Sequence, residues 1–345
     1  MNTNCDLNMG DTTDLTIVTV TYNVMPVIER CIASVQGVYG REGLRVEHLI
    51  IDGVSTDGTV DYLRVQCEQG RISRVISEPD QGIYDAMNKG IREAKGKIIV
   101  FINADDELLP EGVPACCAPI LNGEAEYVYS SASVRDEAGN ECPSVKPKLD
   151  SCFINLPCNH QAMFARTDLL KRMGGFRKDV FRIAADVDLM RRLHAANIQP
   201  AIVDAVPCVF YIGGVSSSVD AAEEWIRLLL EYRQRVAEQI KNIPEHAETL
   251  VNVLRYNLCM IAGLRKNSGV RDMQAMQWTA ELLSGVRGIM PPAVCERGVR
   301  RLNRYAFHYT YRALYKWRKS RSLLNQARVC RTLAGLLRAK GDSFC

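Results

Sequence analysis

Residues 98–106, IIVFINADD, place an apolar run directly before two acidic residues. A run of this composition is typical of a strand that is buried on both faces of a parallel sheet. Asp105 and Asp106 would then emerge at the carboxyl edge of the sheet, where open α/β sheets bind their ligands. Two adjacent carboxylates repel each other, and a divalent cation or a ribose hydroxyl between them would relieve that repulsion. The alternative is an acidic turn whose aspartate caps the next helix.

Two more strand-like runs precede this stretch, and each is followed by a helical pattern. LTIVTV, residues 15–20, leads into a helix near Pro26, and VEHLII, residues 46–51, ends at Asp52 before a helix from Thr59. A third helical pattern spans residues 83–91. Three such units within about 90 residues predict a parallel sheet in an α/β fold. Parallel strands would point Asp52 to the same edge as Asp105, although a simple turn aspartate is the alternative.

The composition is that of an ordinary soluble globular protein, with 47% hydrophobic and 24% charged residues in a chain of 345. This length suffices for two domains. The 13 cysteines form no Cys-x-x-Cys pair and there are only five histidines, which argues for reduced thiols and against a zinc site. The longest uncharged apolar stretch, residues 205–219, has 15 residues and is too short to span a membrane. We therefore expect a cytoplasmic protein.

The C-terminal part differs in charge from the rest. Residues 297–345 hold 13 Lys or Arg and one acid, a net charge of +12, against −9 for the preceding residues. Beyond Pro292 six residues at helical spacing form one apolar stripe flanked by Lys and Arg: Val299, Leu302, Ala306, Tyr309, Ala313 and Trp317. This amphipathic pattern suits peripheral attachment to an anionic membrane surface, on the inner face of the cell membrane. The alternative is a helix packed on the rest of the protein with a solvated basic face.

Three kinds of ligand motif are missing. No Gly-x-Gly-x-x-Gly follows the first strand, and the segment from Gly90 to Lys97 does not match a P-loop. If phosphates bind, a metal must help to hold them. No nucleic-acid-binding motif accompanies the basic segment, so we expect no nucleic acid partner.

Four motifs in order carry a resemblance to a known family. TVTYN (residues 19–23), IDGVSTDGT (51–59), EPDQGIYDAMNKG (78–90) and NADD (103–106) resemble the nucleotide-binding half of family 2 glycosyltransferases, which have the GT-A fold. The resemblance covers roughly residues 14–215, and it is closest to the branch that makes bacterial surface polysaccharides of the colanic-acid type. It implies a doubly wound, mostly parallel sheet followed by a C-terminal helical extension.

The resemblance also implies a donor site. Asp52 would hydrogen-bond the nucleotide base, Asp105 would contact the ribose or the metal shell, and Asp106 would bind the Mn²⁺ or Mg²⁺ that bridges the diphosphate. The family often has Asp where this chain has Asn103. The donor-binding residues implied in full are Thr21, Tyr22, Asn23, Asp52, Asp85, Asn88, Asn103 and Asp105, with Asp106 and Asp105 at the metal.

The acceptor half follows in the middle of the chain. In IAADVDLMRRL, residues 183–193, the resemblance makes Asp186 the catalytic base, with Ala185 where the family often has Glu. Asp186 and Asp188 stand ahead of a helical pattern, so one of them is expected to cap that helix. His160, Gln161 and Asp188 are the implied acceptor-binding residues, although His160 also fits a structural histidine. YIGGVS, residues 211–216, resembles a loop that closes over the donor diphosphate, with a plain β-to-α turn as the alternative.

The expected function is that of an inverting, metal-dependent hexosyltransferase. It would move a sugar from a nucleotide-diphosphate donor, a UDP-sugar, to a saccharide or lipid-linked acceptor in surface polysaccharide or glycan synthesis. A sugar-phosphate nucleotidyltransferase is one alternative, but it usually has a glycine-rich loop where this chain has TYNV, residues 21–24. A non-catalytic nucleotide-sugar binding protein is another, but it would not need Asp186. The expected organisation is a polar tail (1–14), a glycosyltransferase domain (15–218, with halves 15–110 and 111–218) and a helical region (219–345) with its basic helix at 293–340.

Overall fold

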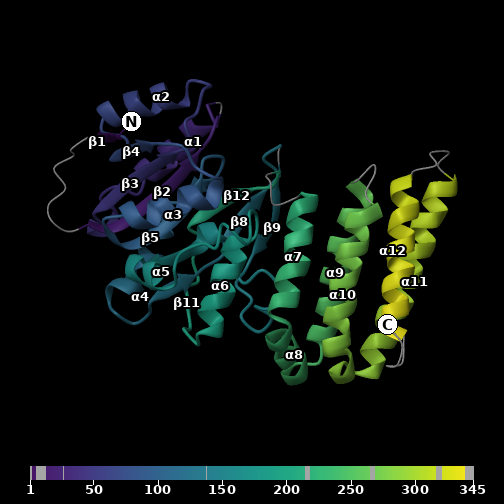
Figure 1. Ribbon diagram of the computed structural model, residues 1–345. Coiled ribbons are helices and arrows are strands. Elements are labelled where there is room, and N and C mark those ends of the chain that lie inside the picture. The colour runs from purple at the N-terminus through teal and green to yellow at the C-terminus, as the bar shows by residue number, and fades with distance from the viewer. Residues whose placement is uncertain are drawn as a thin grey trace. The chain divides into compact units, whose positions relative to one another are not determined.

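The computed structural model describes residues 2–4, 13–25, 27–136, 138–213, 218–264, 269–315 and 321–338. The chain divides into two compact units (Figure 1). The first comprises Met1–Lys148 and Pro157–Gly213, and the second comprises Leu149–Leu156 and Gly214–Cys345. Residues 149–156 thus group with the C-terminal helices, although they lie within the expected glycosyltransferase domain.

An eight-stranded sheet forms the centre of the first unit. The order across the sheet is β1 (Asn2–Asn4), β4 (Arg74–Ser77), β3 (Val46–Asp52), β2 (Thr13–Thr21), β5 (Gly96–Asn103), β10 (Met163–Arg166), β7 (Tyr127–Tyr129) and β11 (Ala201–Ile202). The four strands from β4 to β5 in this order are parallel to one another. Strand β1 pairs antiparallel with β4, and β10 pairs antiparallel with both β5 and β7. The expected parallel sheet is therefore confirmed, while residues 2–4, expected in a polar tail, form an edge strand.

The strands and helices follow the apolar patterns of the sequence. Every residue of β2 and β3 is buried, as expected for strands covered on both faces. Helix α1 buries Ile28, Cys31, Ile32 and Val35, which share one helical face. The helices of this unit are α1 (Ile28–Gln36), α2 (Thr59–Glu68), α3 (Ile83–Glu93), α4 (Val113–Leu121), α5 (Thr167–Arg172) and α6 (Ala185–Ala195), with short 3₁₀ turns η1 (Arg41–Gly43) and η2 (His160–Ala162).

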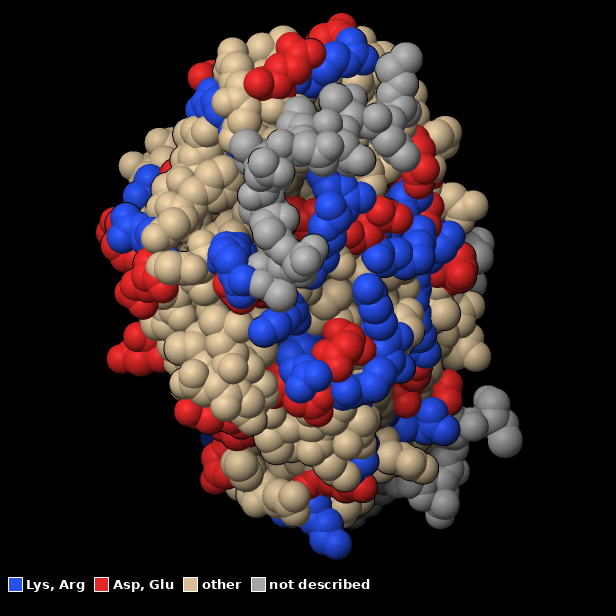
Figure 2. Space-filling model, turned by 90° about the vertical axis from the view of Figure 1, so that its left-hand side faces the viewer, with Lys and Arg blue, Asp and Glu red and all other residues tan. Residues whose placement is uncertain are grey.

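A second, four-stranded sheet meets the first at the acidic pair. Its order is β6 (Glu107–Leu108), β12 (Cys208–Tyr211), β8 (Ala132–Arg135) and β9 (Glu141–Val145). Strand β5 ends at Asn103 and β6 begins at Glu107, so Asp105 and Asp106 lie in the turn between the two sheets. This position gives the pair access to groups from both sheets. On the face drawn in Figure 2, Lys and Arg side chains lie among Asp and Glu side chains and form no patch of a single sign.

The second unit is helical. Its elements are α7 (Val219–Glu231), α8 (Arg233–Asn242), α9 (His246–Leu264), α10 (Gly269–Val286), η4 (Arg287–Ile289), α11 (Pro292–Tyr315) and α12 (Arg321–Arg338). Helix α11 packs against α12 and α9. Val299 and Leu302 of the expected apolar stripe are buried within this unit. The side chains of the four later members, Ala306, Tyr309, Ala313 and Trp317, lie outside the described residues.

Two expectations drawn from the composition concern membrane-spanning helices and the state of the cysteines. No helix in the described ranges has the length and apolar character needed to cross a membrane. Among the described residues ten cysteines are free, which fits the expected thiols. Cys67 is disulfide-bonded, so the expectation of reduced thiols throughout the chain is wrong at that position.

Candidate active site

Asp52 lies at the carboxyl end of β3 and is fully buried. Its carboxylate accepts hydrogen bonds from the hydroxyls of Thr21 (3.0 Å), Ser55 (2.5 Å) and Ser77 (2.8 Å), and from the Ser55 backbone amide (3.0 Å). Thr21 and Ser77 reach it because the register of the parallel strands aligns all three positions. A buried carboxylate needs such partners to offset lost hydration. Asp52 and Thr21 therefore hold the strand ends together, while the expected contact of Asp52 with a nucleotide base stays a prediction.

The loops after β2 and β3 are joined to each other. The Asn23 amide donates to Ser55 Oγ (2.8 Å), and Asn23 Oδ1 accepts from the Thr56 amide (2.9 Å). Asn23 (φ 53°) and Val54 (φ 64°) both occupy the left-handed region, which is unfavourable for a β-branched residue. Backbone strain of this kind concentrates at ligand sites. Asn23, which was expected in the donor site, thus joins these two loops through its hydrogen bonds with Ser55 and Thr56.

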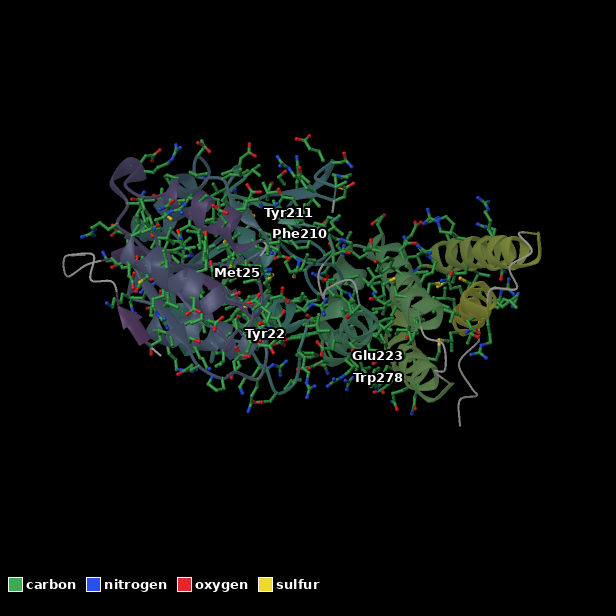
Figure 3. The ribbon with its side chains drawn as sticks, turned by 90° about the horizontal axis from the view of Figure 1, so that it is seen from above. Tyr22, Met25, Phe210, Tyr211, Glu223 and Trp278 are labelled. Carbon is green, nitrogen blue, oxygen red and sulfur yellow. The ribbon has the colours of Figure 1, made fainter. Side chains whose placement is uncertain are left out.

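The exposed part of this region surrounds Gly53. The ring of Tyr22 is 65% exposed and Val54 is 44% exposed. A Cβ at Gly53 would lie 2.6 Å from Asp80 Oδ2 and 3.3 Å from the Tyr22 ring, so a larger residue there would require the Asp80 side chain to move. Tyr22 lies in the loop after β2 together with Met25 (Figure 3). Tyr22 and Val54 are therefore open to a ligand, with the half-buried Asp80 beside them, and the sequence patterns had not singled out Asp80.

Asp106 is enclosed by hydrogen-bond donors and is only 1% exposed. Its Oδ2 accepts from Gln161 Nε2 (2.6 Å) and Asn103 Nδ2 (3.2 Å), and its Oδ1 accepts from the Tyr211 backbone amide (2.9 Å). Burial raises the pKa of Asp106 to about 6; the charge of Asp105 adds to the rise, while the Tyr211 and Gln161 hydrogen bonds oppose it. Gln161 was expected at the acceptor, and in the structure it donates to Asp106.

Asp105, in contrast, is exposed. The turn that carries it is held from outside by Arg30 of α1, whose Nη2 donates to the Asp105 carbonyl (2.6 Å) and whose Nε lies 3.0 Å from Glu107 Oε1. The same guanidinium lies 4.0 Å from the centre of the Tyr211 ring, and the Tyr211 hydroxyl donates to Glu107 (2.6 Å). Phe210 and Tyr211 end β12 (Figure 3). No sequence pattern had indicated that Arg30 and Tyr211 clamp this turn.

The acidic turn offers oxygen atoms of the kind that Mg²⁺ and Mn²⁺ prefer. Besides the two carboxylates, Asn103 Oδ1 is buried and has no hydrogen-bond partner among the described residues. Within those residues no group of three or more His, Cys, Asp or Glu could hold a metal by itself. These residues therefore fit an ion that takes its remaining ligands from a bound diphosphate, which is how Mg²⁺ usually binds.

Asp186 lies in the first turn of α6. Its Oδ1 accepts from the Tyr84 hydroxyl (2.9 Å) and the Val187 amide (2.8 Å), and His160 Nδ1 lies 3.2 Å from its Oδ2. Burial raises the pKa of Asp186, but the hydrogen bond and charge of His160 and the Tyr84 and Val187 hydrogen bonds outweigh burial and hold the pKa below its usual value. The side chain is 15% exposed. The arrangement supplies an ionised carboxylate that is open enough to accept a proton.

Asp188 occupies a different environment and is fully buried. It forms ion pairs with Arg177 and, at 2.9 Å, with Arg192. Both of its oxygens accept hydrogen bonds inside the protein, and the expected contact of Asp188 with an acceptor stays a prediction that these contacts do not support. The expectation that Asp186 or Asp188 caps α6 is also wrong, since the N-cap residue is Ala184 and no side chain bonds there.

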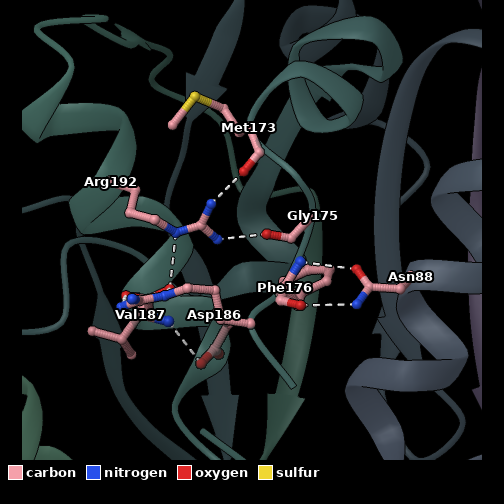
Figure 4. A network of polar contacts seen from close by, with 9 residues as sticks. Asn88, Met173, Gly175, Phe176, Asp186, Val187 and Arg192 are labelled. Atoms are coloured by element: carbon pink, nitrogen blue, oxygen red, sulfur yellow. Dashed lines mark hydrogen bonds and ion pairs between the residues drawn. The ribbon is translucent and has the colours of Figure 1, made fainter. Parts of the chain in front are cut away.

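The turn before Phe176 is held from two sides (Figure 4). Asn88 Nδ2 donates to the Phe176 carbonyl and Asn88 Oδ1 accepts from the Phe176 amide, both at 2.8 Å. Arg192 donates to the carbonyls of Met173 and Gly175. Asn88 therefore fixes the backbone, and its expected contact with the donor stays a prediction. Asp85, also expected at the donor, lies 3.4 Å from Lys178 Nζ.

Comparisons with known proteins identify a family for this chain. The family model described as "Glycosyl transferase family 2" matches residues 16–182. An uncharacterised glycosyltransferase of Mycobacterium tuberculosis is 32% identical over 209 residues, which are 59% of this chain and 77% of the relative. A PGL/p-HBAD biosynthesis glycosyltransferase of Mycobacterium bovis is 29% identical over 226 residues, 63% of this chain and 84% of that one.

Solved structures share the fold at low identity. S. aureus TarS 1–349, in complex with UDP-GlcNAc, superposes with a TM-score of 0.57 at 17% identity, covering 94% of this chain and 91% of that one. The mannosyltransferase PcManGT from Pyrobaculum calidifontis, in complex with GDP-Man and Mn²⁺, gives 0.54 at 17% identity, with coverages of 93% and 87%. The expected α/β fold of GT-A type with C-terminal helices is confirmed, while the colanic-acid branch stays a prediction. By the extent and identity of these matches, the chain belongs to glycosyl transferase family 2.

Proposed function

We propose that this chain is an inverting glycosyltransferase that transfers a sugar from a nucleotide-diphosphate donor, a UDP-sugar, to a hydroxyl of a saccharide or lipid-linked saccharide in polysaccharide or glycan synthesis. The observation that carries the proposal is the state of Asp186. Its carboxylate is 15% exposed, the hydrogen bonds that it accepts hold its pKa below the usual value, and its partner His160 is the neighbour of Gln161, which bonds Asp106. Two consecutive residues thus connect the proposed proton acceptor to the turn that we propose binds the diphosphate.

In the proposed reaction Asp186 accepts the proton of the acceptor hydroxyl. The hydroxyl oxygen forms a bond to the anomeric carbon while the bond from that carbon to the phosphate oxygen breaks, and the diphosphate leaves with the electron pair. One such displacement inverts the anomeric centre. The hydrogen bonds from Tyr84 and Val187 fix Oδ1, so the carboxylate keeps one orientation during proton transfer.

The leaving diphosphate needs compensation for its negative charge. Asp105, Asp106 and the unpartnered Asn103 Oδ1 would hold a Mn²⁺ or Mg²⁺ ion, which would neutralise part of that charge when bound. The Mn²⁺ bound with GDP-Man in PcManGT and the UDP-GlcNAc bound in TarS support a metal and a nucleotide-sugar donor. We propose Tyr22, through its exposed ring, and Asp80 as the contacts for the nucleoside.

A panel of UDP-, GDP- and dTDP-sugars tests this proposal through nucleotide release in the presence of Mg²⁺, Mn²⁺ or EDTA. We expect release from a UDP-sugar with metal and a product of inverted anomeric configuration by NMR. Asp186→Asn should remove this activity, whereas Asp61→Asn, at a side chain that is 83% exposed and paired with Arg64, should retain it. Equal turnover in Asp186→Asn and wild type would refute the assignment of the base.

A further inference from the structure

We propose that His160 is a positioning residue that orients Asp186, and that the turn η2 fixes the distance between the base and the acidic pair. This inference rests on the proposed function, since it concerns the base of that reaction. His160 Nδ1 lies 3.2 Å from Asp186 Oδ2, and the next residue, Gln161, donates to Asp106 Oδ2 at 2.6 Å. Two consecutive side chains therefore reach the two acids on which proton transfer and diphosphate binding depend.

The position of η2 follows from the sheet. Strand β10 begins directly after η2 and runs antiparallel to β5, with Ala165 opposite Ile99. The residues that precede β10 must therefore lie beside the carboxyl end of β5, where Asn103 and the acidic turn are. Gln161 is only 1% exposed, and Ala162 within the same turn is fully buried. A short buried turn of this kind is a rigid support for two side chains.

The environments of the two ring nitrogens of His160 indicate its role. An ionised carboxylate only accepts hydrogen bonds, so His160 Nδ1 must carry the hydrogen of the bond to Asp186. The other ring nitrogen, Nε2, is buried, with less than 1 Å² exposed and no hydrogen-bond partner among the described residues. The side chains of His160 and Asp186 are exposed to a similar extent, 17% and 15%, but the Nε2 atom itself is enclosed, so an acceptor hydroxyl cannot reach it in this arrangement. His160 therefore acts through Asp186 and not on the substrate.

The cavity beside this pair agrees with that role. It has a volume of about 10 Å³, and its lining includes His160, Asp186, Phe101, Met163 and Phe176. Such a volume is at the limit for one water molecule, and the apolar lining offers few other partners. If His160 moved away from Asp186, the hydrogen bond between them would be lost and no other partner would replace it. The hydrogen bond to His160 therefore keeps Asp186 Oδ2 in one place in the unsubstituted chain.

Three substitutions at His160 separate its two nitrogens. The side-chain amide of His160→Asn can reach the place of Nδ1 and keep a donor for Asp186. The amide of His160→Gln extends toward the place of Nε2, and His160→Leu removes both. We expect His160→Asn to keep kcat within a few-fold of wild type, and the Gln and Leu variants to lose about 10- to 100-fold in kcat with the donor KM unchanged. Equal melting temperatures would establish that all three fold.

The pH dependence of kcat gives a readout that a purely structural role would not change. The titratable groups facing Asp186 are His160 from η2 and Tyr84 from α3. Without His160, burial dominates and the pKa of Asp186 rises, so the acid limb should move to higher pH in His160→Leu. It should stay in place in His160→Asn. Full activity in all three variants, or retention by the Gln variant alone, would overturn the inference.

A measurement without turnover tests the pairing itself. With only five histidines, the imidazole nitrogens can be assigned by ¹⁵N NMR, and His160 should carry hydrogen on Nδ1. Asp186→Asn should shift that nitrogen, and Asp61→Asn should not. A His160 that is insensitive to Asp186→Asn overturns this inference alone. A wild-type chain with the expected pairing but no transfer from any donor would instead overturn the proposed function.

Discussion

The Tyr84 hydroxyl lies 2.9 Å from Asp186 Oδ1 and so joins α3, in the donor half, to the candidate base on α6. It also lies 2.6 Å from the Ile183 carbonyl, and its single hydrogen serves one of these acceptors at a time. The Tyr84 ring packs on Phe176 with centroids 5.2 Å apart, and Asn88 holds the Phe176 backbone. Two polar residues of the EPDQGIYDAMNKG motif thus support the acceptor side of the site.

Tyr84→Phe should lower kcat by roughly 10-fold, because it removes a hydrogen bond to a charged group while leaving the ring packed on Phe176. Steady-state kinetics at saturating donor would measure this loss. Tyr39→Phe is a matched control, since its hydroxyl bonds the Arg71 carbonyl at 3.3 Å and has no contact with the site. An unchanged kcat in Tyr84→Phe would mean that the hydroxyl serves Ile183 alone.

Asp186→Asn should reduce kcat by about 10² to 10⁴, the usual contribution of a positioned general base. Donor binding should remain close to that of wild type, because the groups proposed to hold the nucleotide lie in loops after strands, whereas Asp186 lies on α6. Calorimetry with UDP and Mn²⁺, together with kcat, would separate the two effects. A loss of donor affinity as large as the loss of kcat would argue against a role limited to proton transfer.

Asp188→Asn should act on stability and not on chemistry. It leaves Arg177 and Arg192 without their shared carboxylate, and breaking a buried ion pair costs about 3 kcal/mol or more. We expect a clearly lower melting temperature with kcat per folded molecule nearly unchanged. If Asp188→Asn melts like wild type but has lost turnover, the base assignment moves from Asp186 to Asp188.

Much of the fold was predictable because its signals are local. The apolar runs that became β2, β3 and β5 and the periodicity of α1 and α3 depend on neighbouring residues only. The partners of individual polar side chains were not predictable in this way. Asn88 bonds Phe176 across 88 residues and Gln161 bonds Asp106 across 55, so the patterns identified both as polar and could not assign their partners.

The partners of Asp52 are an exception, because the strand pattern of the sequence could have indicated them. Once β2, β3 and β4 are taken as parallel, their final residues Thr21, Asp52 and Ser77 fall side by side in register. The hydroxyls beside Asp52 could therefore have been inferred, and with them its structural role. Arg30 offers no such signal, because its contacts with the Asp105 carbonyl and the Tyr211 ring depend on how α1 packs against both sheets.

Asp106→Asn should stabilise the protein at neutral pH while removing its activity. Burial raises the pKa of Asp106 to about 6, so its contribution to stability is full below the ordinary value of 3.8 and is lost as pH rises through about 6. A shift of this size corresponds to roughly 3 kcal/mol. In EDTA, the variant should melt above wild type near about pH 8 and approach it toward acid pH.

The same variant should lose metal-dependent nucleotide binding, which calorimetry with UDP and Mn²⁺ would measure. Asp61→Asn again serves as the control for removing one negative charge from the surface. Unchanged affinity in Asp106→Asn would exclude Asp106 from the diphosphate site. A lower melting temperature near about pH 8 would contradict the argument from the buried charge.

The basic helix α11 combines a buried apolar side with an exposed basic one. Leu302 is 1% exposed and Val299 is 6% exposed, while Arg304 is exposed. Leu302→Ala should therefore destabilise the helical unit by about 3 kcal/mol, as expected for a cavity at a buried leucine. Arg304→Ala should leave the melting temperature close to that of wild type. A Leu302→Ala variant that melts like wild type would show that this side of the helix is not packed.

The net charge of +12 beyond residue 296 makes a separate prediction for membranes. Each Lys or Arg near an anionic surface contributes roughly 1 kcal/mol, and salt screens this attraction within about 8 Å at physiological ionic strength. Because the described part of the apolar stripe is buried, we expect any vesicle binding to be electrostatic: present with anionic lipid at low salt, weakened by salt, and poor with neutral lipid. Co-sedimentation would measure it, and Arg300→Ala with Arg304→Ala should weaken it without lowering the melting temperature. Binding to neutral vesicles that resists salt would instead require insertion of apolar side chains. If the unsubstituted chain does not bind anionic vesicles at low salt, membrane attachment is ruled out.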